Sequence, residues 1–166
     1  AAKNSKRDVD TLLREPGPDG WTDEAAFDHA ANLVDASADA GRVDGVDRAI
    51  KWFTVLKSRD LEPTNRALLH YFWANAWGVR QTIRHHDEDA AWAWSQPELR
   101  EQIFHLRTAE GAPGFRDLDP YRRAQILTNL ANQLSTAGRF VEAIEGWSQA
   151  LEILPDFWMA RGNLGS

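Results

Sequence analysis

Apolar residues recur three and four positions apart along most of this chain, and breaks rich in proline and glycine interrupt the pattern at intervals. Such spacing is typical of amphipathic helices, whereas a half-buried strand alternates apolar and polar residues. No alternating run of useful length is present in the sequence. The sequence therefore predicts an all-α fold, and the question becomes how the helices pack.

Start and stop signals divide the chain into successive helices. Thr22 and the Asp119-Pro120 pair are typical of helix starts, and Gly41 and Gly138 are typical of helix ends. Ser95-x-Pro97-Glu98 predicts a capping box at the start of another helix. The helices are expected over residues 22–41, 43–57, 64–84, 95–111, 119–137 and 140–153, with a short helical piece at 90–94.

The first twenty residues have a different character. Residues 8–14 have room for two helical turns, but the run Glu15-Pro16-Gly17-Pro18-Asp19-Gly20 is dense in helix breakers. We therefore expect residues 1–20 to form a flexible N-terminal tether.

Residues 124–155 carry a regular pattern of large and small residues. Small residues stand where two paired helices would touch, and Trp147 fills the space beside them. The pattern comprises Leu127, Leu130, Ala131, Leu134, Gly138, Phe140, Ala143, Trp147, Ala150, Leu151 and Pro155. This segment resembles a tetratricopeptide repeat (TPR), a pair of helices in 34 residues. Asn129-Leu130-Ala131 also returns 34 positions later as Asn163-Leu164-Gly165, so a further repeat is expected from Asp156 onward.

The resemblance implies a right-handed solenoid of stacked antiparallel helix pairs. We expect degenerate TPR-like pairs over residues 21–118, a clear repeat over 119–155 and the start of a truncated repeat over 156–166. A half repeat leaves its apolar face uncovered. The chain is therefore interpreted as part of a longer protein, and Phe157, Trp158 and Leu164 are candidates for self-association.

The TPR resemblance also implies a function, because the first helices of such pairs line a concave groove that binds peptides or protein segments. The predicted binding residues are the uncharged polar groups of that helix: Gln125, Thr128, Asn132 and Ser135. The chaperone-binding members hold a peptide carboxylate with a lysine and an asparagine one turn apart. Because Thr128 stands in the lysine position, such a clamp is not expected here.

A second resemblance covers residues 104–165, which are similar to the segment preceding the HEPN nuclease domain in a group of bacterial proteins. The similar stretches are residues 115–118, 125–130 and 138–144. The resemblance implies, as an alternative function, the helical arm of a ribonuclease of a toxin or defence system, with its catalytic part beyond residue 166. HEPN nucleases use an Arg and a His four to six residues apart. Arg80 with His85 and Arg100 with His105 have this spacing, although chance gives such pairs readily and a structural histidine is the favoured interpretation.

Composition excludes several other classes. The net charge of −6 argues against a general binder of nucleic acids or anionic membranes, and the absence of cysteine excludes disulfides and thiolate zinc sites. The run His85-His86-Asp87-Glu88-Asp89 is interpreted as a solvated loop rather than a metal site, and Trp92 and Trp94 as packed rather than exposed. No apolar run reaches the roughly 18 residues of a membrane span. The sequence therefore predicts a cytoplasmic, non-enzymatic interaction protein without metal or cofactor.

Overall fold

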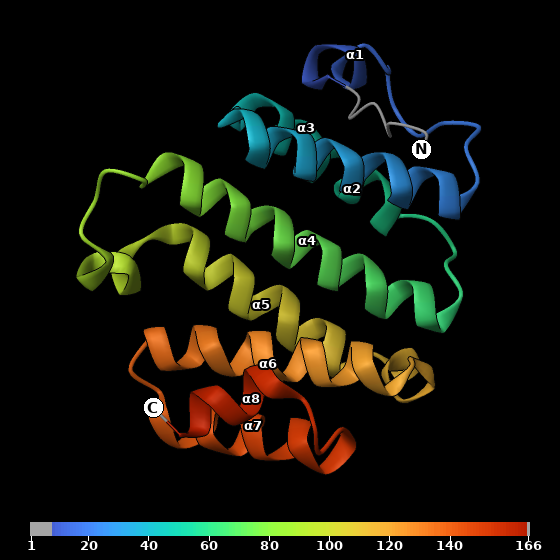
Figure 1. Ribbon diagram of the computed structural model, residues 1–166. Coiled ribbons are helices and arrows are strands. Elements are labelled where there is room, and N and C mark those ends of the chain that lie inside the picture. The colour runs from blue at the N-terminus through green and yellow to red at the C-terminus, as the bar shows by residue number, and fades with distance from the viewer. Residues whose placement is uncertain (1–7, 166) are drawn as a thin grey trace, which may run out of the picture.

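The computed structural model describes residues 8–165, and this part of the chain consists of helices and connecting loops, without strands (Figure 1). The prediction of an all-α fold is confirmed. The helices are α1 (Val9–Leu13), α2 (Asp23–Ala40), α3 (Val43–Lys57), α4 (Pro63–Arg84), α5 (Pro97–Gly111), α6 (Pro120–Thr136), α7 (Phe140–Ile153) and α8 (Trp158–Leu164), with 3₁₀ helices η1 (Ala90–Ser95) and η2 (Pro113–Asp117).

Most of the predicted helix ends are confirmed. Thr22 Oγ1 accepts a hydrogen bond from the Ala25 N–H at 3.2 Å, and the Asp119 side chain caps α6 by accepting from the Arg122 N–H at 2.9 Å. Gly41 ends α2 with φ at 65°, a left-handed conformation that glycine adopts without strain. The capping box at Ser95 is wrong, because its hydroxyl donates instead to the Trp92 carbonyl at 2.8 Å and α5 begins after Gln96.

The helices stack in chain order, from α1 at the top of Figure 1 to α7 and α8 at the bottom. Each helix from α2 to α7 packs against the next one along the chain, and α2 also contacts α4 while α6 contacts α8. Among residues 8–165, no helix is both long and apolar enough to cross a membrane.

Small residues set how closely neighbouring helices approach. A Cβ added at Gly146 on α7 would lie 3.0 Å from the Ala131 Cβ on α6, so this pair packs nearly backbone to backbone. A Cβ at Gly45 on α3 would lie 2.0 Å from Ser37 Oγ on α2. These contacts explain why the sequence places small residues at the centres of helix pairs.

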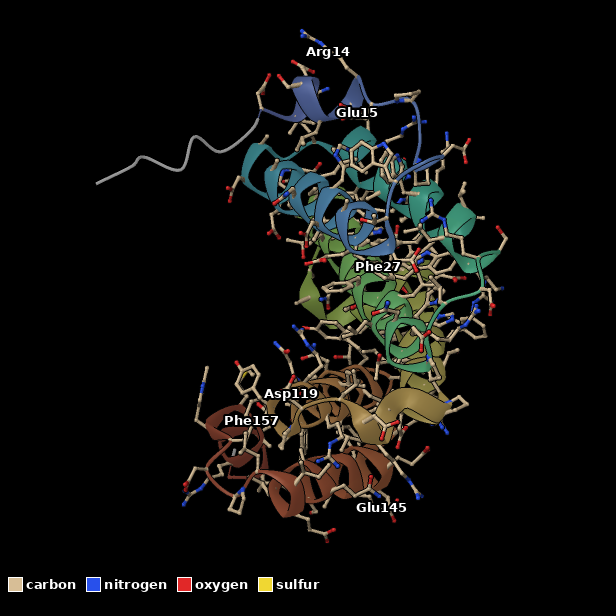
Figure 2. All side chains as sticks on the ribbon, turned by 90° about the vertical axis from the view of Figure 1, so that its right-hand side faces the viewer. Arg14, Glu15, Phe27, Asp119, Glu145 and Phe157 are labelled. Carbon is tan, nitrogen blue, oxygen red and sulfur yellow. The ribbon has the colours of Figure 1, made fainter. Side chains whose placement is uncertain are left out.

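The predicted tether at residues 1–20 is wrong for residues 8–20; residues 1–7 lie outside the described part. Val9 and Leu12 of α1 are each 2% exposed and belong to the core formed by α2, α3 and α4. Arg48 donates to the carbonyl oxygens of Glu15, at 2.9 Å, and Pro16. Figure 2 shows Arg14 and Glu15 at one end of the helix stack. Residues 8–20 therefore pack against that end of the stack.

The C-terminal segment differs from expectation at one residue. Phe157 is 2% exposed and packs edge-on against the Tyr121 ring, with 5.5 Å between ring centroids. Trp158 and Leu164 do remain accessible, at 74% and 38% exposed. Phe157 is therefore unavailable for the predicted self-association, because α8 already folds back against α6 within the same chain.

Candidate functional site

A cavity of about 470 Å³ lies between α2, α4, α5 and α6, and we call it the groove. Its volume falls in the range of roughly 300–1,000 Å³ that is usual for ligand sites. Its lining combines aliphatic and small residues with polar ones: Val34, Asp35, Ala38, Ala74, Asn75, Gly78, Val79, Thr82, Ile83, Gln102, Leu106, Asn129 and Gln133. Three helix pairs contribute to it, so the groove exists only in the assembled stack.

The floor of the groove is fixed by hydrogen bonds. Gln102, which is 5% exposed, donates from Nε2 to Gln81 Oε1 at 2.6 Å and to the Glu98 carbonyl at 3.3 Å. Opposite it stands Gly78, where an added Cβ would lie 3.0 Å from Gln102 Oε1. The glycine therefore lets α4 and α5 approach closely beneath the cavity.

The walls of the groove, by contrast, carry free polar groups. Within residues 8–165, the side chains of Asn75 on α4 and of Asn129 and Gln133 on α6 make no hydrogen bond to another residue. All three are half-buried. Each amide offers donors and an acceptor at once. The groove thus presents unused hydrogen-bonding capacity beside apolar surface.

The four predicted binding residues do not line this groove. Thr128 is fully buried, and Gln125 Oε1 accepts from Arg122 at 3.0 Å. Asn132 Oδ1 accepts from Trp147 Nε1 at 2.9 Å and from Asn163 Nδ2 at 2.7 Å, and Ser135 is half-buried.

For Asn132, the cause lies in the packing of α8 against α6. α8 packs against this helix, and the bond from Asn163 to Asn132 shows which side of α6 it covers. The side left open carries Asn129 and Gln133, which the repeat pattern did not single out. The sequence did contain a signal for this coverage of α6: a further repeat was expected from Asp156 onward, and its first helix must cover one side of the preceding pair.

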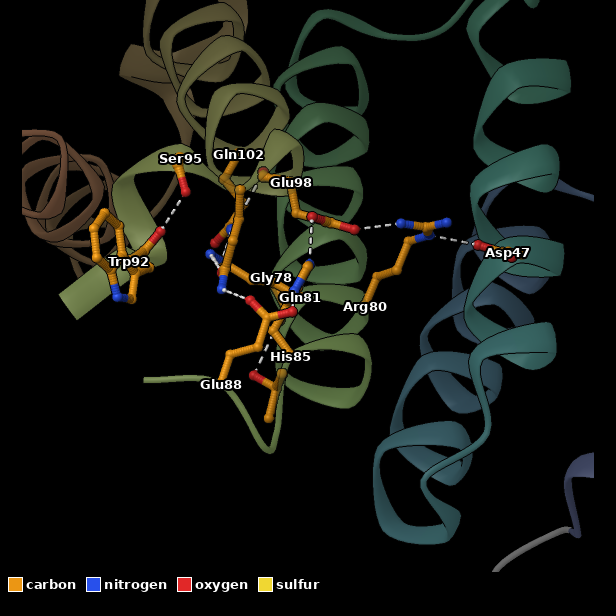
Figure 3. A network of polar contacts seen from close by, with 12 residues as sticks. Asp47, Gly78, Arg80, Gln81, His85, Glu88, Trp92, Ser95, Glu98 and Gln102 are labelled. Carbon is orange, nitrogen blue, oxygen red and sulfur yellow. Dashed lines mark hydrogen bonds and ion pairs between the residues drawn. The ribbon is translucent and has the colours of Figure 1, made fainter. Parts of the chain in front are cut away.

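A second polar cluster surrounds Glu98, which is 1% exposed near the start of α5 (Figure 3). Its carboxylate binds Arg80, and it also lies 3.1 Å from His85 Nε2. Arg80 Nε in turn donates to Asp47 at 2.8 Å, while His85 Nδ1 lies 2.8 Å from Glu88 Oε1. We call these residues the Glu98 cluster; it ties α3, α4 and α5 together.

The charges in the Glu98 cluster shift the pKa values of its members. The hydrogen bond to Glu88, supported by that to Glu98, raises the pKa of His85. Burial alone would raise the pKa of Glu98, but its backbone hydrogen bond and the nearby His85 and Arg80 together hold that pKa below its usual value. The cluster is thus built to keep a buried carboxylate ionised.

Neither Arg–His pair singled out by spacing forms an open catalytic face. Arg80 and His85 are brought together, but both contact the buried Glu98 carboxylate. His105 is 4% exposed, stacks on Trp73 at 4.3 Å and lies with its Nδ1 3.0 Å from that of His70, whereas Arg100 is exposed. His105 therefore has a structural role in the packing of α4 against α5, which is the interpretation that the sequence analysis favoured.

The loop after α4 exposes two aromatic rings that were expected to pack. Trp92 and Trp94 are each 60% exposed, and η1 buries none of its residues. Their rings pair with each other at 6.4 Å between centroids. In the preceding acidic stretch His85 and Glu88 belong to the Glu98 cluster. Within residues 8–165, no group of three or more His, Asp or Glu residues is arranged to hold a metal ion.

Comparison with known proteins adds no assignment: no protein-family model, curated protein or solved structure matches this chain significantly. The site is therefore interpreted from its own chemistry.

Proposed function

We propose that this chain is a non-enzymatic interaction segment that binds a peptide or a protein segment in the groove between α2, α4, α5 and α6. The observation that carries the proposal is the combination of a preformed cavity with unused amides of Asn75, Asn129 and Gln133 on its walls. Polar side chains that are half-buried without a partner lose hydrogen bonds to water, and a ligand that supplies new ones recovers that loss.

The architecture supports the same proposal. The α6–α7 pair has the close backbone contact between Ala131 and Gly146 that a TPR-like pair requires, and α2, α4 and α6 are the first helices of successive pairs. We propose a TPR-like stack in which these first helices form the binding face. A rigid stack of this kind binds without refolding, so little binding energy is lost to ordering the receptor.

The test is selection of random peptides displayed on phage against the immobilised chain, followed by fluorescence anisotropy with the enriched peptides. Ala38 lines the groove and is exposed, so Ala38→Trp fills the cavity without disturbing the core. Ala25→Trp is the matched control, an exposed position on the same helix away from the groove. We expect Ala38→Trp to weaken binding at least about tenfold, or about 1.4 kcal/mol, and the control to change it less than about twofold.

Two outcomes contradict the proposal. One is that no peptide is enriched above the level for an unrelated helical protein. The other is that the enriched peptides bind the Ala38→Trp and Ala25→Trp variants equally well, which places binding outside the groove.

A further inference from the structure

The lining of the groove carries negative charge and no positive charge. Asp35 on α2 is its sole ionisable lining residue, and no lysine, arginine or histidine lines it. Asp35 is exposed at the rim and has no ion-pair partner within residues 8–165. The helix that carries it also contains the exposed Glu24 and Asp28 and no lysine or arginine, whereas its Asp23 pairs with Arg59 at 2.9 Å. The potential along this wall is therefore negative, which favours a cationic group in the occupant.

The free amides indicate the conformation of the occupant. A peptide in a helix satisfies its own backbone N–H and C=O groups, so it has little use for amides along a wall. An extended peptide presents both groups at regular intervals, and Asn and Gln side chains pair with them as donor and acceptor. Asn75 stands on α4, and Asn129 and Gln133 stand one turn apart on α6. This arrangement favours an extended segment lying between the two helices.

The apolar part of the groove indicates which kind of side chain the occupant carries beside its basic residue. Val79 on α4 and Leu106 on α5 line it, together with Val34 on α2, and Gly78 keeps the floor clear of a side chain. The apolar lining contains aliphatic and small residues only, and aliphatic side chains fill such a space without needing a polar partner.

We infer that the groove takes an extended segment in which a lysine or arginine lies close to an aliphatic residue. The basic side chain pairs with Asp35, the aliphatic side chain lies against Val79 and Leu106, and the backbone bonds to the free amides. This inference rests on the proposed function and names the class of partner that the groove accepts.

The probes for the test are the peptides enriched by selection against the wild-type chain, resynthesised with each Lys or Arg changed to Met or to Glu. The protein variants are Asp35→Asn and Asp35→Lys, with Asp28→Asn and Asp28→Lys as matched controls, because Asp28 is exposed on the same helix outside the groove. Exposed ion pairs contribute little, so we expect Asp35→Asn to weaken binding about threefold, and Asp35→Lys at least about tenfold because it adds repulsion. Both Asp28 controls should stay within about twofold.

A charge swap makes the test specific. Asp35→Lys should bind the Glu-substituted peptide more tightly than the original peptide, reversing the wild-type preference. One outcome overturns the inference and leaves the proposed function standing. In that outcome Ala38→Trp blocks peptide binding, but the peptides lack basic residues or bind the Asp35→Lys variant as tightly as the wild type. When Ala38→Trp blocks none of the peptides, the proposed function and the inference fail together.

Discussion

The buried pair of His70 and His105 is expected to make the fold sensitive to mild acid. The two side chains are 5% and 4% exposed, and their Nδ1 atoms lie 3.0 Å apart between α4 and α5. One ring donates through its Nδ1–H and the other accepts at Nδ1, so the hydrogen bond is lost when both imidazoles are protonated. Burial lowers the pKa of His70 to about 4, helped by Lys57 and Arg66, and burial with the charge of His70 lowers that of His105 to about 3.

The sign of the effect follows from these values. Both folded pKa values lie below the unfolded value of 6.5, so the stabilising contribution is complete above that value and is lost as the pH falls toward the folded pKa values. Near pH 5 the unfolded chain binds protons that the folded chain excludes. The loss of unfolding free energy between about pH 7.5 and about pH 5 is about 2 kcal/mol for each histidine. His85, whose pKa is raised, acts in the opposite direction and favours the folded chain in acid.

Urea unfolding followed by circular dichroism at both pH values measures the effect. The double variant His70→Asn/His105→Asn removes both titrating rings, so it should lose most of the pH-dependent difference even though its absolute stability falls. His86→Asn is the control, because the side chain of His86 is 68% exposed and lies outside the buried pair. Comparing the variant with the wild type cancels the contribution of His85.

A double variant that keeps the wild-type difference between the two pH values refutes this reasoning. Nuclear magnetic resonance of the wild-type histidines provides a second readout that does not depend on the variant folding. The imidazole signals of His70 and His105 should remain in the neutral position down to about pH 5. Titration of every histidine above that pH contradicts the buried neutral pair.

Three further substitutions test the packing. Glu98→Gln removes the buried charge that Arg80 and His85 contact and should lower the unfolding free energy in urea by about 2–4 kcal/mol. Asp47→Asn, at the exposed edge of the same cluster, should cost less than about 1 kcal/mol. Equal losses contradict a buried ion-pair role. Gly114→Ala places a Cβ 2.1 Å from a backbone atom of Pro63 and should lower the unfolding free energy by at least about 1–3 kcal/mol. Gly162→Ala is the control, because nothing lies within 4 Å of its added Cβ, and it should change the unfolding free energy little. Equal unfolding free energies for the two variants show that the loop at Gly114 relaxes. Because the Trp92 ring is 60% exposed, Trp92→Ala should change the unfolding free energy by less than about 0.5 kcal/mol. The same change should remove a fluorophore that acrylamide quenches readily. A loss of several kcal/mol shows instead that the Trp92 ring is packed.

The helices could be predicted from the sequence because their ends are decided locally. Thr22 and Asp119 accept hydrogen bonds from residues three positions along the chain, and Gly41 supplies its own left-handed turn. Such signals involve only a few neighbouring residues. The start of α5 was misplaced for the same kind of reason, since the Ser95 hydroxyl has a closer local acceptor in the Trp92 carbonyl.

The packed N-terminal segment could not be predicted in this way, because its partners are distant in sequence. Arg59 donates to the carbonyl oxygens of Pro18 and of Trp21, the latter at 3.0 Å, across about forty residues. Proline and glycine correctly indicated an irregular backbone at residues 15–20. An irregular segment is held in place when its carbonyls find donors, and only the tertiary structure shows that they do.

The groove illustrates how the same limit affects a functional prediction. The repeat pattern placed uncharged polar residues on α6, but it did not decide which of them α8 would cover. Asn132 satisfies its amide oxygen within the chain, bonding to Trp147 and Asn163, whereas Asn129, three residues earlier, is left without a partner at the edge of the cavity. Two asparagines on one helix thus have different roles, one joining α6 to α7 and α8 and the other available to a ligand. The distinction depends on hydrogen-bond satisfaction, which is why the proposed binding face is placed at the unsatisfied amides rather than by residue type or repeat position.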